Sequence, residues 1–213
     1  MINELHLDEL QISYNGVSPV FSPVTQLLHR GEVVAITGNN GAGKSTLLMG
    51  IAGLLRPFHG RVYLMSDNVE YPFESLRHRC GYVAPGLALY DELQAWEQIE
   101  FDAKLRGQES CLSVAKDLLR TFSLDKRADS MISSFSTGMK QRLKIVMATY
   151  FSPDVLLLDE PTSNLDDDGF KAFSEVIDKT AEQGCIVVLA TNDQRDRALC
   201  SREFRLGSPS SHS

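Results

Sequence analysis

Hydrophobic positions in the first quarter of the chain change between strand-like and helix-like spacing. Residues 2–14 mix apolar and polar positions in a pattern that predicts a strand pair or one irregular strand. Residues 32–37 (EVVAIT) are a β-branched run bounded by glycines, which predicts a strand. Apolar residues then recur at helical spacing from Leu47 to Leu55, so we expect a helix that is ended by Pro57. A strand, a glycine-rich segment and a helix therefore follow one another directly.

Helical spacing dominates the middle of the chain. Residues 60–65 predict one further strand, after which apolar residues three and four positions apart predict helices at 95–105 and 112–122. A third helix is expected over 136–151, capped at its start by Ser136 and ended by the Ser-Pro pair that follows.

The last part of the chain returns to an alternation of strands and helices. The apolar runs 155–158 and 186–190 lack any polar alternation, which is typical of parallel strands covered on both faces. A helix is predicted between them at 170–180. Alternating helices and buried strands predict an α/β layered core, and the helix-rich stretch at about 86–135 interrupts it as a candidate subdomain.

Composition narrows the classes of function. The chain has 213 residues and a formal net charge of -7, so it lacks the basic field that a phosphate-backbone binder needs, and no direct nucleic-acid binding is expected. No apolar run approaches the ~20 residues that span a bilayer, and the first residues do not resemble a signal peptide. The four cysteines form no Cys-x-x-Cys pair, which favours a reducing compartment.

The glycine-rich segment between the predicted strand and helix matches a phosphate-binding loop. Its pattern is G-x-x-x-x-G-K-[ST] in the strand–loop–helix context that this motif requires. Backbone N–H groups and the helix N-terminus can surround an anion, Lys44 adds a positive charge for the β- and γ-phosphates, and Ser45 offers a hydroxyl ligand to Mg²⁺. The predicted nucleotide-binding residues are Gly38, Asn39, Asn40, Gly41, Ala42, Gly43, Lys44, Ser45 and Thr46.

The buried run at 155–158 ends in two adjacent carboxylates. Asp159 lies where a parallel strand ends, the edge at which open α/β sheets bind ligands, and it is a candidate Mg²⁺ ligand together with Ser45. Glu160 can position or deprotonate an attacking water. An apolar strand that meets a polar turn would look the same, so this interpretation depends on the phosphate-binding loop.

A third motif lies between these two. Residues 135–142 read FSTGMKQR, in which Ser136, Thr137, Gly138 and Met139 begin the helix predicted before the Asp-Glu pair. The segment resembles the signature of ABC-type ATPases, usually Leu-Ser-Gly-Gly-Gln, in a variant familiar from ABC-2 exporters. With the loop and the Asp-Glu pair, the chain resembles this family over roughly residues 2–206.

The resemblance implies a fold and an assembly. It implies one P-loop domain over 1–206, with a parallel central sheet, a small antiparallel β subdomain and an inserted helical subdomain, followed by a flexible tail at 207–213. It also implies ATP and Mg²⁺ as ligands and a head-to-tail dimer, in which Ser136 and its neighbours close over ATP held by the other chain. Tyr14 matches an aromatic residue that stacks on adenine, and residues 163–166 match a segment that touches the dimer partner.

Two positions depart from the family pattern. Pro85 occupies the place of a glutamine that links Mg²⁺ and water to the helical subdomain, and proline has no side-chain donor or acceptor. Asn192 occupies the place of a histidine that contacts the γ-phosphate; its amide can donate a hydrogen bond but cannot become charged near neutral pH. Since Glu160 is present, we expect the chain to hydrolyse ATP. Asn192 would take part in catalysis, but because its amide is neutral we expect the hydrolysis to be slow.

The leading functional hypothesis is the motor subunit of an ABC transporter, in a homodimer or a heterodimer. The membrane partner would be a separate transmembrane permease, and the chain would lie in the cytoplasm on the cytoplasmic face of the membrane. The exporter-like signature favours export. Two alternatives stay open: a soluble ABC ATPase that takes no part in transport, and a weakly hydrolysing ATP-gated module.

Overall fold

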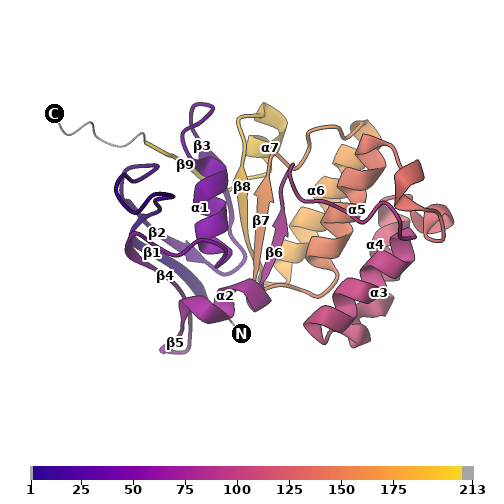
Figure 1. Cartoon of the computed structure of the whole chain (residues 1–213), viewed down its shortest axis with the longest axis horizontal. Coiled ribbons are helices and arrows are strands. Elements are labelled where there is room, and N and C mark those ends of the chain that lie inside the picture. Colours follow the sequence, from indigo (N-terminus) through magenta and orange to yellow (C-terminus); the bar gives the residue numbers. More distant parts are fainter. Residues whose placement is uncertain (1, 208–213) are drawn as a thin grey trace.

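Two β-sheets of different character form the scaffold of the chain (Figure 1). A computed structural model describes residues 2–207. A four-stranded antiparallel sheet has the order β2-β1-β4-β5, and a five-stranded parallel sheet has the order β6-β7-β8-β3-β9. The first sheet comprises β2 (Val24–His29), β1 (Glu4–Gln11), β4 (His59–Ser66) and β5 (Val69–Tyr71), and the second β6 (Cys80–Val83), β7 (Val155–Asp159), β8 (Ile186–Ala190), β3 (Val33–Thr37) and β9 (Arg202–Arg205).

Seven α-helices lie around these sheets in residues 2–207. In Figure 1, α1 lies between the two sheets, whereas α3 to α6 lie together on the other side of the parallel sheet. The helices are α1 (Lys44–Ile51), α2 (Phe73–Arg79), α3 (Ala95–Arg106), α4 (Leu112–Thr121), α5 (Thr137–Thr149), α6 (Asp167–Glu182) and α7 (Gln194–Ala198).

Alternate residues of the central strands enter two different cores. In β7, Val155 and Leu157 pack into a core shared with α1 and the antiparallel sheet, whereas Leu156 and Leu158 pack into a core shared with α3 to α6. Every residue of β7 and β8 is buried. This explains why these two runs are apolar throughout: both faces of the sheet are covered.

The helix-rich stretch shares its core with the parallel sheet. Ile99 of α3 and Leu119 of α4 are buried in the same cluster as Leu156 and Phe173 of α6. The stretch at about 86–135 contains α3 and α4, whose apolar side chains are continuous with those of the sheet, and its status as a subdomain stays a prediction. The division of the chain into a domain at 1–206 and a tail stays a prediction, since 208–213 lie outside the described residues.

The structure confirms the α/β class and corrects several boundaries. Helix α1 ends at Ile51, before Leu54 and Leu55, because Gly53 turns the chain with a left-handed φ of 72° that glycine adopts without strain. Residues 2–14 contain one irregular strand, the second of the two predicted possibilities, because the pairing of β1 with β2 shifts register after Leu7. Helix α5 ends at Thr149, earlier than expected.

Two further predictions concern the cysteines and membrane-spanning segments. The four cysteines, all within the described range, are free thiols, and burial raises the pKa of the Cys80 thiol to about 12. Between residues 2 and 207, none of the helices has the length and apolar character needed to cross a bilayer.

Candidate nucleotide site

Three loops meet at one edge of the parallel sheet. Strands β7, β8 and β3 are neighbours and run parallel, so their carboxyl ends lie side by side. The segments that follow these strands are the predicted phosphate-binding loop after β3, the Asp-Glu pair at the end of β7, and residues 191–193 after β8. Ligands of open parallel sheets bind at this edge.

The phosphate-binding loop leads directly into α1. Gly43 is the N-cap of α1 with a left-handed φ of 95°, and as a glycine it brings no side chain to cap the helix. Lys44 is only 8% exposed, and its Nζ donates a hydrogen bond to the backbone oxygen of Gly38 at 2.9 Å. The loop is thus closed around a buried ammonium group, while the first N–H groups of α1 point to the loop side, as an anion site requires.

Ser45 and Asp159 supply oxygen atoms at the same place. Asp159 is 5% exposed, and this burial raises the pKa of its carboxyl. A hydrogen bond with Ser45 and the positive charge of Lys44 act in the opposite direction and offset part of the rise. A hydroxyl and a carboxylate are the hard oxygen donors that Mg²⁺ prefers, so this pair fits the ion. In the described residues no group of three or more His, Cys, Asp and Glu could hold a metal, and phosphate and water would therefore complete the shell.

Glu160 is held in an unusual backbone conformation. Its φ is 46°, in the left-handed region that glutamate rarely adopts. Its backbone N–H donates to Ala190 at 2.9 Å, and the Ser163 hydroxyl donates to its backbone oxygen at 2.8 Å. Burial raises the pKa of its carboxyl, Lys44 lowers it, and the nearby acids led by Asp159 raise it further. A higher pKa makes the carboxylate a stronger base, as a proton acceptor for water needs to be.

The loop after β8 contacts the phosphate-binding loop through Asn192. Its Oδ1 accepts a hydrogen bond from the N–H of Gly38 at 3.4 Å, and its Nδ2 donates to Oδ1 of Asn40 at 3.4 Å. Asn192 is exposed, so these long bonds leave its amide accessible. The structure therefore brings Asn192 to the loop, as the sequence predicts, although its part in hydrolysis stays a prediction.

Tyr14 lies beside the first turn of α1. Its hydroxyl and Oγ1 of Thr46 are 3.0 Å apart, and 65% of the residue is exposed. An exposed ring anchored at one end next to the phosphate-binding loop is compatible with stacking on a base. The stacking itself stays a prediction.

Pro85 follows β6 and is held by its backbone. Nζ of Lys144, on α5, donates to the backbone oxygens of Pro85 at 3.2 Å and of Ala84 at 3.4 Å. Burial lowers the pKa of Lys144, and the nearby charge of Lys140 lowers it further. Lys144 of α5 thus fixes the segment after β6 that contains Pro85.

The signature residues begin α5 and adjoin the loop after β7. Oγ of Ser136 accepts a hydrogen bond from the N–H of Met139 at 3.2 Å, which confirms the predicted cap. Gly138 faces Asn164 so closely that a Cβ there would lie 2.8 Å from the backbone oxygen of Asn164. Ser136 and Thr137 are exposed, as the contact face of a dimer would require.

The signature is separated from the phosphate-binding loop of its own chain. Helix α5 packs against β6, and β7 and β8 lie between β6 and β3. The apolar residues of α5 pack on one face of the parallel sheet, whereas those of α1 pack on the other. The two anion-binding segments therefore lie at different parts of the surface.

Two buried polar residues near the site were not identified from the sequence. Gln141 donates to the backbone oxygen of Pro161 at 2.8 Å, and Asp196 of α7 accepts hydrogen bonds from Thr162 and Thr191. Asp196 stands in the charged run QRDR, which is typical of an exposed surface. Only the fold reveals that it points inward.

Comparisons with known proteins agree with the geometry. The family model described as ABC transporter matches residues 21–163. The ABC transporter ATP-binding protein YbbA of Escherichia coli K12 is 35% identical, over 88% of this chain and 86% of its own length. The ABC transporter ATP-binding protein NatA of Bacillus subtilis is 32% identical, over 83% of this chain and 74% of its own length.

Solved structures resemble the whole fold. The structure of an ATP-binding subunit of an ABC transporter has a TM-score of 0.86 and 31% identity, and the match covers 95% of this chain and 85% of that one. The dimeric cassette MJ0796 has a TM-score of 0.82 and 26% identity, covering 95% and 94%. The cassette cbiO1 of Clostridium perfringens, part of the complex cbiONQ, has a TM-score of 0.77 and 26% identity, covering 97% and 86%.

Replacing Glu160 with glutamine should separate ATP binding from hydrolysis. Glu160→Gln keeps the size of the side chain but removes the base, so turnover should fall by about 10²-fold or more while ATP affinity stays near that of the wild type. Phosphate release and equilibrium ATP binding measure the two quantities. Unchanged turnover in this variant would exclude Glu160 as the base.

Replacing Asn192 with histidine should accelerate hydrolysis. Asn192→His places a group that can become charged beside Gly38, and we expect turnover at saturating ATP to rise roughly tenfold, which corresponds to about 1.4 kcal/mol in the barrier. Asn192→Ala is the matched control and should be slower than the wild type. A rate that stays flat or falls with histidine means that Asn192 does not limit the chemistry.

Proposed function

Because this chain belongs to the ABC transporter ATPase family, we propose that it drives a separate transmembrane permease by closing as a head-to-tail dimer around two ATP. The observation that carries the proposal is the combination, on one chain, of a closed phosphate-binding loop, an adjoining Asp159–Glu160 pair and a distant, exposed signature at Ser136. The loop leads into α1 on one face of the parallel sheet and the signature begins α5 on the other face, so we infer that they do not enclose one nucleotide within a chain. Two chains in opposite orientation would bring each loop against the partner's signature.

Binding and hydrolysis would use different residues. The N–H groups at the start of α1 and Lys44 would bind the phosphates, and Ser45 and Asp159 would hold Mg²⁺, which supplies charge neutralisation on the phosphate oxygens. Glu160 would accept a proton from the attacking water, and the amide of Asn192 would donate a hydrogen bond to the γ-phosphate. A neutral amide stabilises added negative charge less than a cation does, so hydrolysis is slow.

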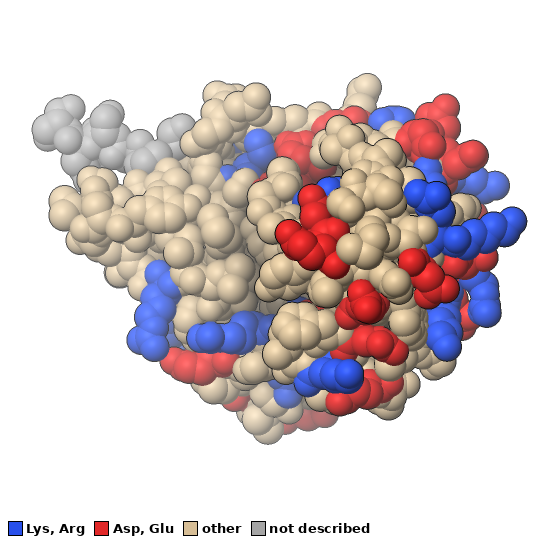
Figure 2. All heavy atoms as spheres, turned by 45° about the vertical axis from the view of Figure 1, so that its right-hand side comes forward, with Lys and Arg blue, Asp and Glu red and all other residues tan. Residues whose placement is uncertain are grey.

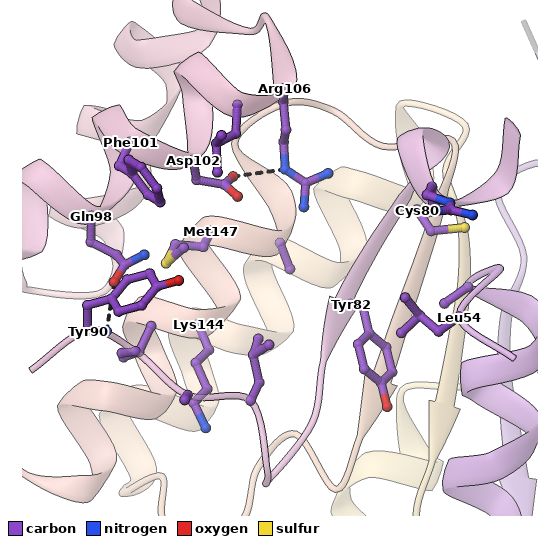
Figure 3. A pocket seen from close by; sticks show the side chains of 17 residues that line it. Leu54, Cys80, Tyr82, Tyr90, Gln98, Phe101, Asp102, Arg106, Lys144 and Met147 are labelled. Atoms are coloured by element: carbon purple, nitrogen blue, oxygen red, sulfur yellow. Dashed lines mark hydrogen bonds and ion pairs between the residues drawn. The ribbon is translucent and has the colours of Figure 1, made fainter.

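A groove on the surface offers a place for the permease. It measures about 320 Å³ and lies between α3 on one side and the end of α1 with β6 on the other. Figure 3 shows Leu54 and Tyr82 facing Tyr90 and Phe101 across this groove. Tyr90 is 55% exposed and Leu54 54%, a cluster of apolar surface of the kind that partners cover.

The walls of the groove hold the segment that follows β6. The side-chain oxygen of Gln98, on α3, accepts a hydrogen bond from the N–H of Tyr90 at 2.9 Å, which ties the segment after β6 to the helical side. Lys144 lines the groove and also holds Pro85. A permease segment seated here would therefore contact the same segment that leads from β6 towards the ATP site, which is the connection that coupled transport needs.

The charge on the surface fits a protein partner better than a nucleic acid. On the face in Figure 2, acidic and basic side chains are interspersed over the helices rather than collected into a basic stripe. The similar cassette cbiO1 is part of a transporter complex, which supports a membrane partner for this chain too. The surface charge, the similarity to cbiO1 and the Ser136–Met139 variant of the signature together support our proposal that the chain lies on the cytoplasmic face of an exporter, as a homodimer or a heterodimer.

A charge in the groove should release the membrane partner. Leu105 of α3 lines the groove and is 71% exposed, so Leu105→Glu should fold normally, yet weaken the retention of a membrane subunit by about tenfold or more after detergent extraction. Val69→Glu, on the exposed edge strand β5, is the control and should retain the subunit. A wild-type chain that retains no membrane protein would contradict the transporter role, and equal retention by Leu105→Glu would exclude this groove.

A further inference from the structure

A buried acid lies outside all the motifs that point to ATP. Asp196 belongs to the short helix α7 after β8 and is 1% exposed. Aspartate is rarely buried so completely unless its carboxylate has partners, because the loss of water is costly. Asp196 belongs neither to the phosphate-binding loop nor to the Ser45–Asp159 pair, so the binding of ATP and Mg²⁺ does not explain its burial.

Its two carboxylate oxygens bind two different loops. Oδ1 accepts a hydrogen bond from the hydroxyl of Thr162 at 2.7 Å, and Oδ2 accepts one from the hydroxyl of Thr191 at 2.8 Å. Thr162 is 4% exposed and Thr191 is completely buried. Hydrogen bonds to a charged acceptor in a buried place are stronger than those between neutral groups, so this bridge is a firm connection.

The bridge joins the two segments that carry the hydrolytic residues. Thr162 follows Glu160 by two residues, and Thr191 comes immediately before Asn192. The hydroxyl of Thr191 also accepts a hydrogen bond from the N–H of Asp193 at 3.0 Å, so it is fixed from both sides. Within this pair of loops, the Asp196 carboxylate thus connects the base to the residue that faces the phosphate.

We propose that Asp196 is a positioning residue, which sets the spacing between Glu160 and Asn192 during hydrolysis without touching ATP. The inference rests on the hydrolysis proposed above. Glu160 has a left-handed backbone, a conformation that persists only where the surroundings impose it. The clamp on Thr162 is one of the contacts that would impose it, and an error of about 1 Å in such a position costs on the order of 10²-fold in rate.

The threonine hydroxyls allow a test that hardly changes the shape of the side chains. Thr162→Val and Thr191→Val each remove one donor and keep a branched side chain, whereas Thr162→Ser keeps the donor. We expect each valine variant to lower kcat by about tenfold with ATP affinity within about twofold of the wild type. Thr162→Ser keeps the hydroxyl and loses only the methyl group, so it should stay close to the wild-type kcat.

A second measurement does not need hydrolysis. In Asp196→Asn, hydrogen exchange of the backbone amides in 159–166 and 190–194 should become faster, because asparagine is uncharged and only one of its two terminal atoms accepts a hydroxyl hydrogen, which weakens the bridge between the loops. Asp178→Asn, an exposed position on α6, makes the same change of charge and should leave this exchange unaltered. Because exchange is read without turnover, failure of the clamp and absence of ATP hydrolysis are distinguishable.

The outcomes separate positioning from simple stabilisation. A lower kcat in both valine variants, rescue by Thr162→Ser and faster exchange in both segments of Asp196→Asn support the proposal. Valine variants with the kcat of the wild type overturn it. So does a parallel loss of kcat and ATP affinity that Thr162→Ser fails to rescue, and so does unchanged exchange in Asp196→Asn.

Discussion

Parallel pairing of β7, β8 and β3 is the constraint on which the rest of the structure depends. It brings the carboxyl end of β3 to the same edge as those of β7 and β8, which lie more than 100 residues further along the sequence, so the phosphate-binding loop, the Asp159–Glu160 pair and Asn192 meet there. Such pairing requires both faces of the sheet to be covered, and α1 covers one face while α3 to α6 cover the other. The helical side that carries the proposed partner groove is therefore also one of the two covers of the parallel sheet.

Electrostatics at this edge balance one buried cation against several acids. Lys44 lowers the pKa of Asp159 and of Glu160, whereas burial, the larger effect, raises both. Asp159 is tied to Ser45 and suits a metal ion, while Glu160 is more exposed and suits the activation of water. The Asp196 carboxylate accepts hydrogen bonds from Thr162 and Thr191, and so connects the loop after Glu160 to the loop after β8. In the proposed mechanism, affinity for ATP and the rate of its hydrolysis would therefore depend on separate groups.

The site could be predicted from the sequence wherever a function needs adjacent residues. The loop from Gly38 to Thr46 and the cap at Ser136 follow from local chemistry, and the buried runs of β7 and β8 follow from their lack of alternation. What the sequence could not predict depends on distant contacts: Lys144 reaching the backbone of Pro85, and the inward orientation of Asp196 within a charged run. The sequence did not predict the early end of α1, because proline interrupts a helix more strongly than glycine does and Pro57 is therefore its expected end. Gly53 comes first along the chain and already turns it out of the helix.

The central claim is that each nucleotide lies between the loop of one chain and the signature of another, and mixing two inactive variants tests it directly. Lys44→Ala disables the loop of a chain, and Ser136→Arg disables its signature. In a head-to-tail dimer of one chain of each kind, one composite site stays intact and the other is doubly disabled. The account predicts that the mixture hydrolyses ATP although neither variant does so alone, with a rate that rises as the two variants approach equal amounts. A mixture that stays as inactive as its components would contradict it.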